Sequence, residues 1–520
     1  MAHPAPDLST DAGRVAGDAR RWRDDARQPA GDRVLVESLV LADETPAADD
    51  EPTASDRLAR LLGRFVSPWL TSLIFHLSLL LILALIVLRD DPLAAYPGLI
   101  VSRDPQPQLD RLHGLELPTE ATLEMPSAAA VEQQAIRSAE IALQESFADA
   151  RAPATAAPLA PLLRGNLMTP VGPRGGGLQG RAPKARGQLV ARRGGNAASE
   201  NAVALGLAWL ADHQLDDGSW RLNHHLAPSC PGLCTHPGNV GSTTAATGLA
   251  LLPFLGAGST HEQGPYRDVV RRGIYYLGSR MRLTPQGGDL QEGTMYAQGL
   301  ASIALCEAYA MTGDPALREY CEAAIEFIVS AQHGGGGWRY MPGQAGDTTS
   351  FGWQLMALKS GRLGDLRVPS PTLSLASEFL DSVQADGGAH YGYQAPDDAP
   401  TTTAIGLLCR MYLGWPREHE ALGRGVRFLS EQGPSPTNLY YNYYATQVMC
   451  HYDNAYWEPW NAALRDHLIA TQATEGHERG SWWFEDAKTH SAGRLYNTAM
   501  AVMILEVYYR HMPLYQPLGE

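Results

Sequence analysis

The chain has 520 residues, of which 44% are hydrophobic and 19% are charged, a composition typical of a globular protein with a substantial core. Its formal net charge at pH 7 is −15. Because a nucleic-acid-binding protein needs a basic surface to contact phosphates, this charge argues against a nucleic-acid partner.

The first ninety residues predict a polar tail followed by a membrane anchor. Residues 1–60 are rich in Asp, Arg, Ala and Pro and contain few aromatic side chains, which predicts a disordered tail. Residues 65–88 contain no Asp, Glu, Lys or Arg. As a helix this run would extend about 36 Å, more than the roughly 30 Å hydrocarbon core of a bilayer. We therefore predict one transmembrane helix at 65–88, with the lipid bilayer as its partner.

The charges beside the apolar run predict its orientation. Arg57, Arg60 and Arg64 lie on its N-terminal side, whereas Arg89 on the other side is followed directly by two aspartates. Cytoplasmic flanks carry the excess of Lys and Arg. We therefore expect a cytoplasmic N-terminus and an extracytoplasmic location for everything after residue 89.

Residues 90–198 predict a largely disordered linker, with a possible short helix at 128–150 where apolar residues follow a helical period. Residues 171–196 near its end are basic and contain no acidic residue. Two interpretations remain open for this stretch. It could attach to an anionic surface such as lipid headgroups or a wall polymer, or it could be a flexible tether kept soluble by its charge.

A motif of glutamine, glycine and tryptophan recurs from residue 214 onward, twice in the strict form Q-x3-G-x-W. Successive repeats lie about fifty residues apart, the spacing of a structural repeat. The motif positions are Gln214, Gly218 and Trp220; Gln332, Gly336 and Trp338; Gln384 and Gly388, with His390 in place of the tryptophan; and Gln472 and Gly476, with the tryptophan delayed to Trp482.

Helical hairpins surround these motifs. In each repeat an amphipathic segment precedes the glycine-rich turn and a more apolar segment follows it. The amphipathic segments are 201–214, 266–281, 317–332, 373–384, 421–432 and 461–472, and the apolar segments are 242–255, 294–311, 348–361, 401–414, 439–452 and 494–509. Six such hairpins predict an all-α fold, an (α/α)6 toroid over residues 199–515 whose apolar helices form the inner ring.

The motif is predicted to be architectural. Glycine adopts the backbone conformations that a tight turn out of a helix requires. The tryptophan would then pack against neighbouring helices, and the glutamine amide would bond unpaired groups at the helix end.

The Q-x3-G-x-W repeats resemble the motif of squalene–hopene and oxidosqualene cyclases, and the hairpin series resembles the wider α/α-toroid superfamily that includes protein prenyltransferase β-subunits. Residues 334–361, 401–415 and 494–515 also resemble bacterial membrane-anchored proteins with prenyltransferase and squalene oxidase repeats. The resemblance implies a location in the bacterial inner membrane. It also implies a polyisoprenoid-type lipid as the molecule that the toroid binds or modifies.

The catalytic motifs of these families are missing. Residues 399–404, APTTTA, are the nearest counterpart of the cyclase motif D-x-D-D-T-A and keep Thr403 and Ala404 but none of its aspartates. None of the six cysteines has the Asp two positions earlier that the prenyltransferase zinc site uses. Cyclisation by the family mechanism is therefore not expected, and neither a metal nor a cofactor is predicted.

Polar residues where the turns enter the inner helices are the remaining candidates for catalysis. Tyr443, His490, Arg494 and Tyr496 could converge on one cavity as acid, base and anion-stabilising groups. Asp347 could form a carboxylate pair with Asp398. The alternative for the Asp, as for neighbouring Ser and Thr, is N-capping of the inner helices. Convergence would suit an envelope polysaccharide lyase or glycosidase. Without it, the toroid would be a non-catalytic binding or scaffold protein.

The loop 229–239, SCPGLCTHPGN, contains Cys230 and Cys234. Outside the cytoplasm a disulfide between them is expected, with two free thiols as the open alternative. Zinc is possible in principle, but Cys-x3-Cys with scattered histidines is a poor match to the spacing of structural zinc sites.

Overall fold

The computed structural model describes residues 76, 167, 177–453, 455–486 and 490–515. The chain divides into two units, Met1–Arg103 and Asp104–Glu520, and the fold below belongs to the second. Among the described residues, no helix combines the length and apolar character needed to cross a bilayer. The predicted tail at 1–60, the predicted helix at 128–150 and, apart from His76, the predicted transmembrane helix at 65–88 lie outside the described residues.

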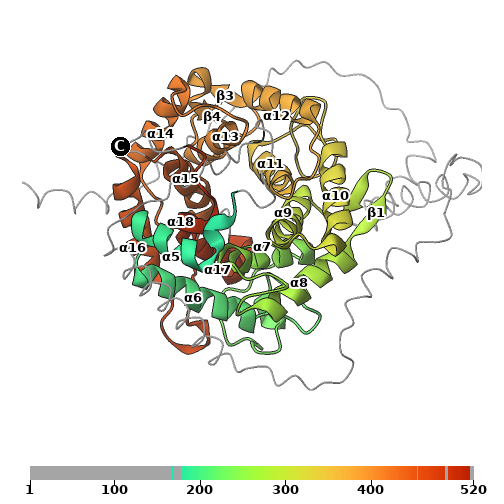
Figure 1. Ribbon diagram of the computed structural model, residues 1–520, viewed down its shortest axis with the longest axis vertical. Coiled ribbons are helices and arrows are strands. Elements are labelled where there is room, and N and C mark those ends of the chain that lie inside the picture. Colours follow the sequence, from blue (N-terminus) through green and yellow to red (C-terminus); the bar gives the residue numbers. More distant parts are fainter. Residues whose placement is uncertain (1–75, 77–166, 168–176, 454, 487–489, 516–520) are drawn as a thin grey trace, which may run out of the picture. The chain divides into compact units, whose positions relative to one another are not determined.

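Helical hairpins form a closed ring with one set of helices outside and the other inside (Figure 1). The outer helices are α6 (Ala197–Asp212), α8 (Arg267–Arg280), α10 (Pro315–Ser330), α12 (Ser370–Val383), α14 (Glu420–Gln432) and α16 (Trp457–Thr471). The inner helices are α7 (Thr243–Gly256), α9 (Met295–Thr312), α11 (Thr348–Leu363), α13 (Pro400–Tyr412), α15 (Leu439–Tyr452) and α17 (Gly493–Leu505). The prediction of six hairpins in an α/α toroid is confirmed.

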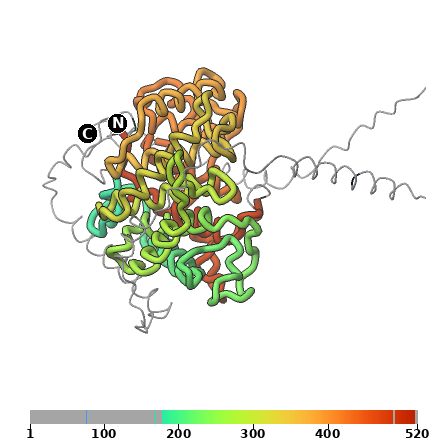
Figure 2. Tube along the Cα trace, turned by 90° about the vertical axis from the view of Figure 1, so that its right-hand side faces the viewer, coloured from blue at the N-terminus to red at the C-terminus, as the bar shows by residue number. Residues whose placement is uncertain are grey.

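The ring closes where the first hairpin meets the last. Helix α17 packs against both α6 and α7, and the green and red ends of the ring lie side by side in both views (Figures 1 and 2). The inner helices are buried on nearly every face, whereas the outer helices bury one face only. This difference follows from the sequence, because the inner segments are apolar all round and the outer ones are amphipathic.

Short strands and 3-10 turns lie between the helices of the ring. Strands β1 (Arg282–Thr284) and β2 (Gly287–Asp289) form one antiparallel hairpin, and β3 (Gln384–Ala385) and β4 (His390–Tyr391) form another. Single 3-10 turns are η3 (His224–Leu226), η4 (Asp386–Gly388), η5 (Gly476–Glu478) and η6 (His490–Ala492). The helix α17 is followed directly by the short α18 (Val507–Arg510).

The basic stretch at the end of the predicted linker differs from the prediction. It forms η2 (Gln179–Arg181) and α5 (Pro183–Arg192), which pack against α18. Arg181 is 1% exposed, and its guanidinium lies 2.8 Å from the carboxylate of Glu307 in α9. Composition alone left open a solvated tether or a segment attached to an anionic surface. Instead, Glu307, which is distant in the sequence, pairs with Arg181, and both side chains are buried.

The Q-x3-G-x-W motif has the architectural role that was predicted. The Gln214 side-chain amide donates to the Gly218 carbonyl in its own turn at 2.9 Å, and to the Val269 carbonyl in the next outer helix, also at 2.9 Å. The Trp220 indole N–H donates to the Leu210 carbonyl near the end of α6 at 2.7 Å. Each motif therefore ties a turn to the outer helices on both sides of it.

Two further repeats show the same pattern. Gln332 bonds the carbonyls of Gly336 and Thr372 at 2.8 and 3.0 Å, and Gln472 bonds those of Gly480 and Ala202 at 2.9 and 2.8 Å. The indoles of Trp338 and Trp482 each donate to their own outer helix at 2.7 Å. Since Ala202 belongs to α6, Gln472 closes the ring.

Two motif positions need correction. In the last repeat Gly480, rather than Gly476, holds the motif place, because its carbonyl accepts from the glutamine and its φ is +92°. In the motif that begins at Gln384, Tyr391 rather than His390 replaces the tryptophan. Its backbone N–H donates to Thr403 at 3.1 Å, as the Trp482 N–H donates to a threonine of α17. The oxygen of Gln384 beside Gly388 lies 3.4 Å from Arg410, outside the usual pattern.

An ionic network fills the ring where the inner helices end. Glu307 lies 2.8 Å from Arg181 and 3.4 Å from Arg510, and Arg510 lies 2.9 Å from Glu506. All four side chains are almost completely buried. Arg181 and Arg510 also donate to carbonyls in the last turns of α7, where a helix end attracts positive charge.

Candidate functional site

The candidate functional site is a cavity of about 770 Å³ at the N-terminal ends of the inner helices. Its volume lies within the roughly 300–1,000 Å³ of small-molecule pockets. The aromatic lining is Tyr296, Tyr340, Trp353, Tyr393, Tyr440 and Tyr496. The aliphatic lining is Leu222, Val240, Ala245, Leu249, Leu300, Ala399, Pro400 and Ala492, and the polar lining is Ser242, Thr294, Thr349, Asp397, Thr401, Thr402, Asn438 and Ser491. Every inner helix, or the turn before it, contributes.

A chain of hydroxyl groups leads from the cavity wall to a buried carboxylate. The Thr349 hydroxyl donates to Oδ1 of Asp347 at 2.6 Å, so its oxygen must accept the proton of the Tyr296 hydroxyl, 2.7 Å away. Burial raises the pKa of Tyr296 well above its usual value, which keeps that proton on the phenol. Both protons therefore point into the wall and away from the cavity.

Asp347 is the N-cap of α11. Its Oδ1 accepts from the Ser350 backbone N–H at 2.8 Å, and the residue has no exposed surface. Its Oδ2 has no hydrogen-bond partner among the described residues, and the nearest cation, Arg339, lies 3.9 Å away. Asp347 thus lies behind the cavity wall, in the capping role that was the alternative to catalysis.

Tyr443 lies inside the inner ring rather than on the cavity surface. Its ring stacks on that of Trp353, with centroids 5.6 Å apart and planes 18° apart. Burial raises the pKa of Tyr443 to about 12, so the phenol stays neutral at physiological pH.

The remaining three candidates separate around the start of α17. Arg494 pairs with Glu478 at 3.0 Å and donates to the Thr235 carbonyl at 3.1 Å, which ties two loops together. His490 is exposed, with its ring edge-on to Trp483. Tyr496 lines the cavity, and its hydroxyl has no partner among the described residues.

The five predicted catalytic residues therefore do not converge, and Tyr496 alone among them lines the cavity. For Arg494 and Tyr496 the reason is helix geometry, because residues two positions apart on a helix lie on nearly opposite faces. Asp397 is the single carboxylate among the described residues that line the cavity, and it is largely exposed.

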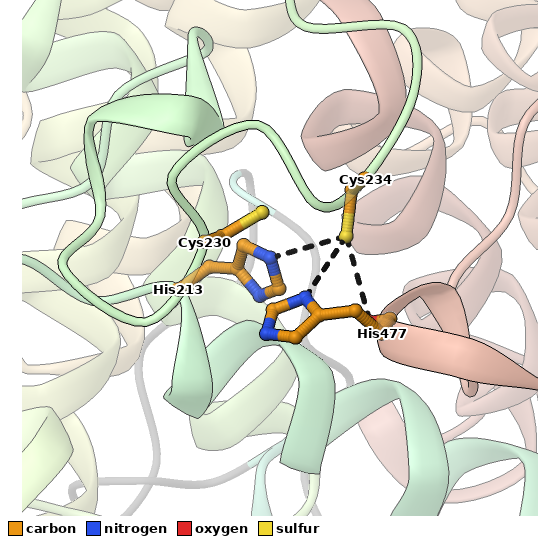
Figure 3. A group of neighbouring side chains, drawn as sticks. All are labelled: His213, Cys230, Cys234 and His477. Atoms are coloured by element: carbon orange, nitrogen blue, oxygen red, sulfur yellow. Dashed lines mark hydrogen bonds between the residues drawn. The ribbon is translucent and has the colours of Figure 1, made fainter.

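The predicted disulfide between Cys230 and Cys234 is not formed, since both cysteines are free. Their side chains lie instead with two histidines, His213 at the end of α6 and His477 in η5 (Figure 3). The sequence did not identify His213 and His477 as neighbours of the cysteines, because both lie outside the loop and His477 is far from it in the chain. The available signal was their position near motif glutamines, one residue before Gln214 and five after Gln472.

No family model matches the chain, and no curated protein is similar to it. Solved structures with some likeness include the GH76A α-1,6-mannanase from Salegentibacter sp. HEL1_6, with 10% identity over 60% of this chain and 98% of that chain and a TM-score of 0.42. A variant of the type II terpene cyclase MstE from Scytonema, in complex with geranylgeranyl dihydroxybenzoate, shows 12% identity over 60% of this chain and 97% of that chain, with a TM-score of 0.41. These values are too low to bear on activity, and the toroid is evident from the helix arrangement itself.

Proposed function

We propose that the toroid binds the apolar chain of an isoprenoid-type lipid in the cavity at the N-terminal ends of its inner helices. The observation that carries this proposal is the cavity of about 770 Å³ with predominantly aromatic and aliphatic walls. Burying apolar surface contributes about 25 cal/mol per Å², so a long hydrocarbon chain gains most from such a site.

The tyrosine hydroxyl groups support an apolar ligand. Tyr340 and Tyr393 pair with each other at 2.8 Å, and the Tyr440 hydroxyl donates to the Thr349 carbonyl at 3.1 Å. These polar atoms are already partnered within the wall, which leaves mainly ring surface for a ligand. The polar lining residues Asp397 and Asn438 would contact a polar head group.

Binding is favoured over cyclisation of the lipid. The segment 399–404 that corresponds to the cyclase motif supplies Pro400, Thr401 and Thr402 to the cavity wall, and none of these is an acid. An alkene needs a strong acid for protonation, whereas the hydroxyl protons near Asp347 point into the wall. The predicted transmembrane helix at 65–88 would hold the toroid beside the bilayer that contains such lipids.

A polysaccharide is the second candidate ligand, because aromatic rings also stack on sugar faces. Glycosidases, however, use a pair of carboxyl groups about 5–10 Å apart. With Asp397 as the single carboxylate among the described lining residues, this cavity offers little for that chemistry.

The proposal is tested first by native mass spectrometry and lipid extraction of the full chain purified with its native lipids, followed by titration with geranylgeraniol. Trp353 lies in the cavity wall, so binding is expected to change tryptophan fluorescence. Leu300→Trp places a larger side chain in the cavity and should weaken binding by about tenfold or more, because it narrows the room for the chain. Leu283→Trp is the control, since that side chain is 65% exposed on β1.

Equal affinities for the two variants would place the lipid elsewhere on the protein. Binding of an oligosaccharide, but of no isoprenoid, in a manner sensitive to Leu300→Trp would replace the lipid by a glycan.

A further inference from the structure

We propose that His213, Cys230, Cys234 and His477 form a structural Zn²⁺ site that fastens the first hairpin of the ring to the last. The four side chains come from three separate segments and meet at one point (Figure 3). His213 follows α6, the two cysteines lie in the loop before α7, and His477 lies in η5 after α16.

The ligand atoms lie nearly as close together as a tetrahedral zinc ion would hold them. One nitrogen or sulfur from each residue lies within 4.8 Å of the other three. The Cys234 sulfur lies 3.5 Å from Nε2 of His213 and 3.1 Å from Nδ1 of His477. Zinc with Zn–S bonds of about 2.3 Å and Zn–N bonds of about 2.0 Å holds such atoms roughly 3.3–3.8 Å apart. Small side-chain adjustments therefore suffice for coordination.

A hydrogen bond orients His213 as a zinc ligand, and a nearby carboxylate favours the same for His477. Nδ1 of His213 lies 2.6 Å from the Trp209 carbonyl, which accepts its proton and leaves the lone pair of Nε2 facing Cys234. Nε2 of His477 lies 3.4 Å from a carboxylate oxygen of Asp212, which leaves Nδ1 for the metal. Ligating histidines usually donate their second N–H to a carbonyl or a carboxylate in this way.

The loop presents both thiols to the same side. The Cys230 backbone N–H donates to the Ala227 carbonyl at 2.9 Å, and the Gly232 N–H donates to the Cys230 carbonyl at 2.6 Å. Gly232 has a φ of +79°, a conformation that favours glycine and that reverses the chain between the cysteines. The poor match of the sequence to zinc sites lies in the scattered histidines, since the Cys-x3-Cys spacing itself falls within the two to four intervening residues of structural sites.

Burial indicates a structural rather than a catalytic metal. His213 and Cys230 have no exposed surface, and Cys234 is 2% exposed. Four protein ligands leave no position open for water or substrate, and none of the four residues lines the cavity. Two thiolates neutralise Zn²⁺, so binding releases two protons, one from each thiol.

Another acidic and histidine group among the described residues makes a weaker candidate. His261 lies 3.0 Å from Asp314, which also caps α10 through the Ala316 N–H at 2.9 Å, and Glu262 beside them is exposed. An ion pair and a helix cap explain that group without a metal.

The test is the zinc content of the full chain, purified in detergent under reducing conditions without chelator and measured by elemental mass spectrometry. We expect about one zinc ion per chain. Cys234→Ser and His477→Asn should each reduce that content severalfold. Cys409→Ala, at a buried cysteine of α13 outside the group, should keep it. Asp212→Asn, which alters only the partner of His477, should lower zinc affinity about 10–100-fold.

A second measurement uses the unaltered chain, so that the test does not depend on whether the variants fold. The unaltered chain loaded with Co²⁺ should show the absorption of tetrahedral cobalt with thiolate charge transfer. In addition, Cys230 and Cys234 should resist alkylation until a chelator is added. A folded chain that retains no zinc or cobalt would overturn the proposal, as would a Cys230–Cys234 disulfide in the reduced preparation. Metal retained by folded Cys234→Ser but lost from His261→Asn would move the site to the other group.

Discussion

Single glycines decide how the chain leaves each outer helix. In the run Gly334 to Gly337 the four residues look identical, yet their surroundings differ. Gly336 has a φ of +86°, and a Cβ there would collide with the Leu375 carbonyl oxygen, whereas a Cβ at Gly334 would meet nothing within 4 Å. The run therefore contains at least one glycine that the fold requires and at least one that it does not.

Gly336→Ala is expected to destabilise the protein by at least about 1–3 kcal/mol, because an L-residue is strained at positive φ. The collision with the Leu375 carbonyl adds to that strain. Gly334→Ala should lie near zero or be slightly stabilising, because it only reduces the freedom of the unfolded chain. Urea denaturation of the two variants checks this, and equal effects would show that the turn tolerates either residue.

Helix ends, rather than helix faces, carry the charges inside this ring. At the C-terminal end of α11, Lys359 is 5% exposed and its ammonium lies 3.8 Å from the centroid of the Tyr412 ring. Burial lowers the pKa of Lys359 from 10.5 to about 7. Glu307 opposes this shift, and Arg181 and Arg510 add to it. The imidazoles of His451 and His511 also face the amine.

Lys359→Met is expected to raise stability, and the gain should shrink as the pH rises from 7 towards 10.5. Between these values the unfolded chain keeps a proton on Lys359 that the folded protein has lost, so the stability of the unaltered protein increases with pH in this window. Below pH 7 both states are protonated and the burial cost is complete.

Unfolding free energies of Lys359→Met and of the unaltered chain, measured near pH 7 and near pH 10, check this expectation. Lys184→Met on α5 is the control because Lys184 is exposed, and its effect should be small at both values. A gain for Lys359→Met that does not change with pH would mean that the amine remains charged in the folded protein.

Closure of the ring is a property of the whole molecule. Gln472 reaches the Ala202 carbonyl of α6, and α17 packs on α6 and α7. The proposed zinc site would add a third connection at the same seam, between the end of α6 and η5. In theory, a metal ion that closes a long loop of the chain stabilises the folded protein more than one that closes a short loop.

Removal of zinc by a chelator is therefore expected to lower the melting temperature of the full chain, and added Zn²⁺ should restore it. Cys234→Ser should start from the lower temperature and should not respond to either treatment. Geranylgeraniol affinity should change much less than the melting temperature, because no zinc ligand lines the cavity. A melting temperature that is insensitive to chelator in the zinc-loaded chain would contradict a role in closing the ring.

The hairpins could be predicted from the sequence because their signals are local. Apolar periodicity distinguishes the inner segments from the outer ones, and the Gln–Gly–Trp motif marks four of the turns. Capping was also predictable, since Asp347 accepts from the backbone N–H group of Ser350 three residues later. These features depend on residues within a few positions of one another.

Only the tertiary structure decided which distant residues meet. Gly480 rather than Gly476 accepts the hydrogen bond from Gln472. Tyr496 lines the cavity, whereas His490 and Arg494 do not. Arg181 is buried in an ion pair with Glu307. The tertiary structure also gathered the loop cysteines with two histidines from opposite ends of the ring. Such contacts depend on how the whole toroid closes. The closure cannot be inferred from the local sequence pattern of a single segment.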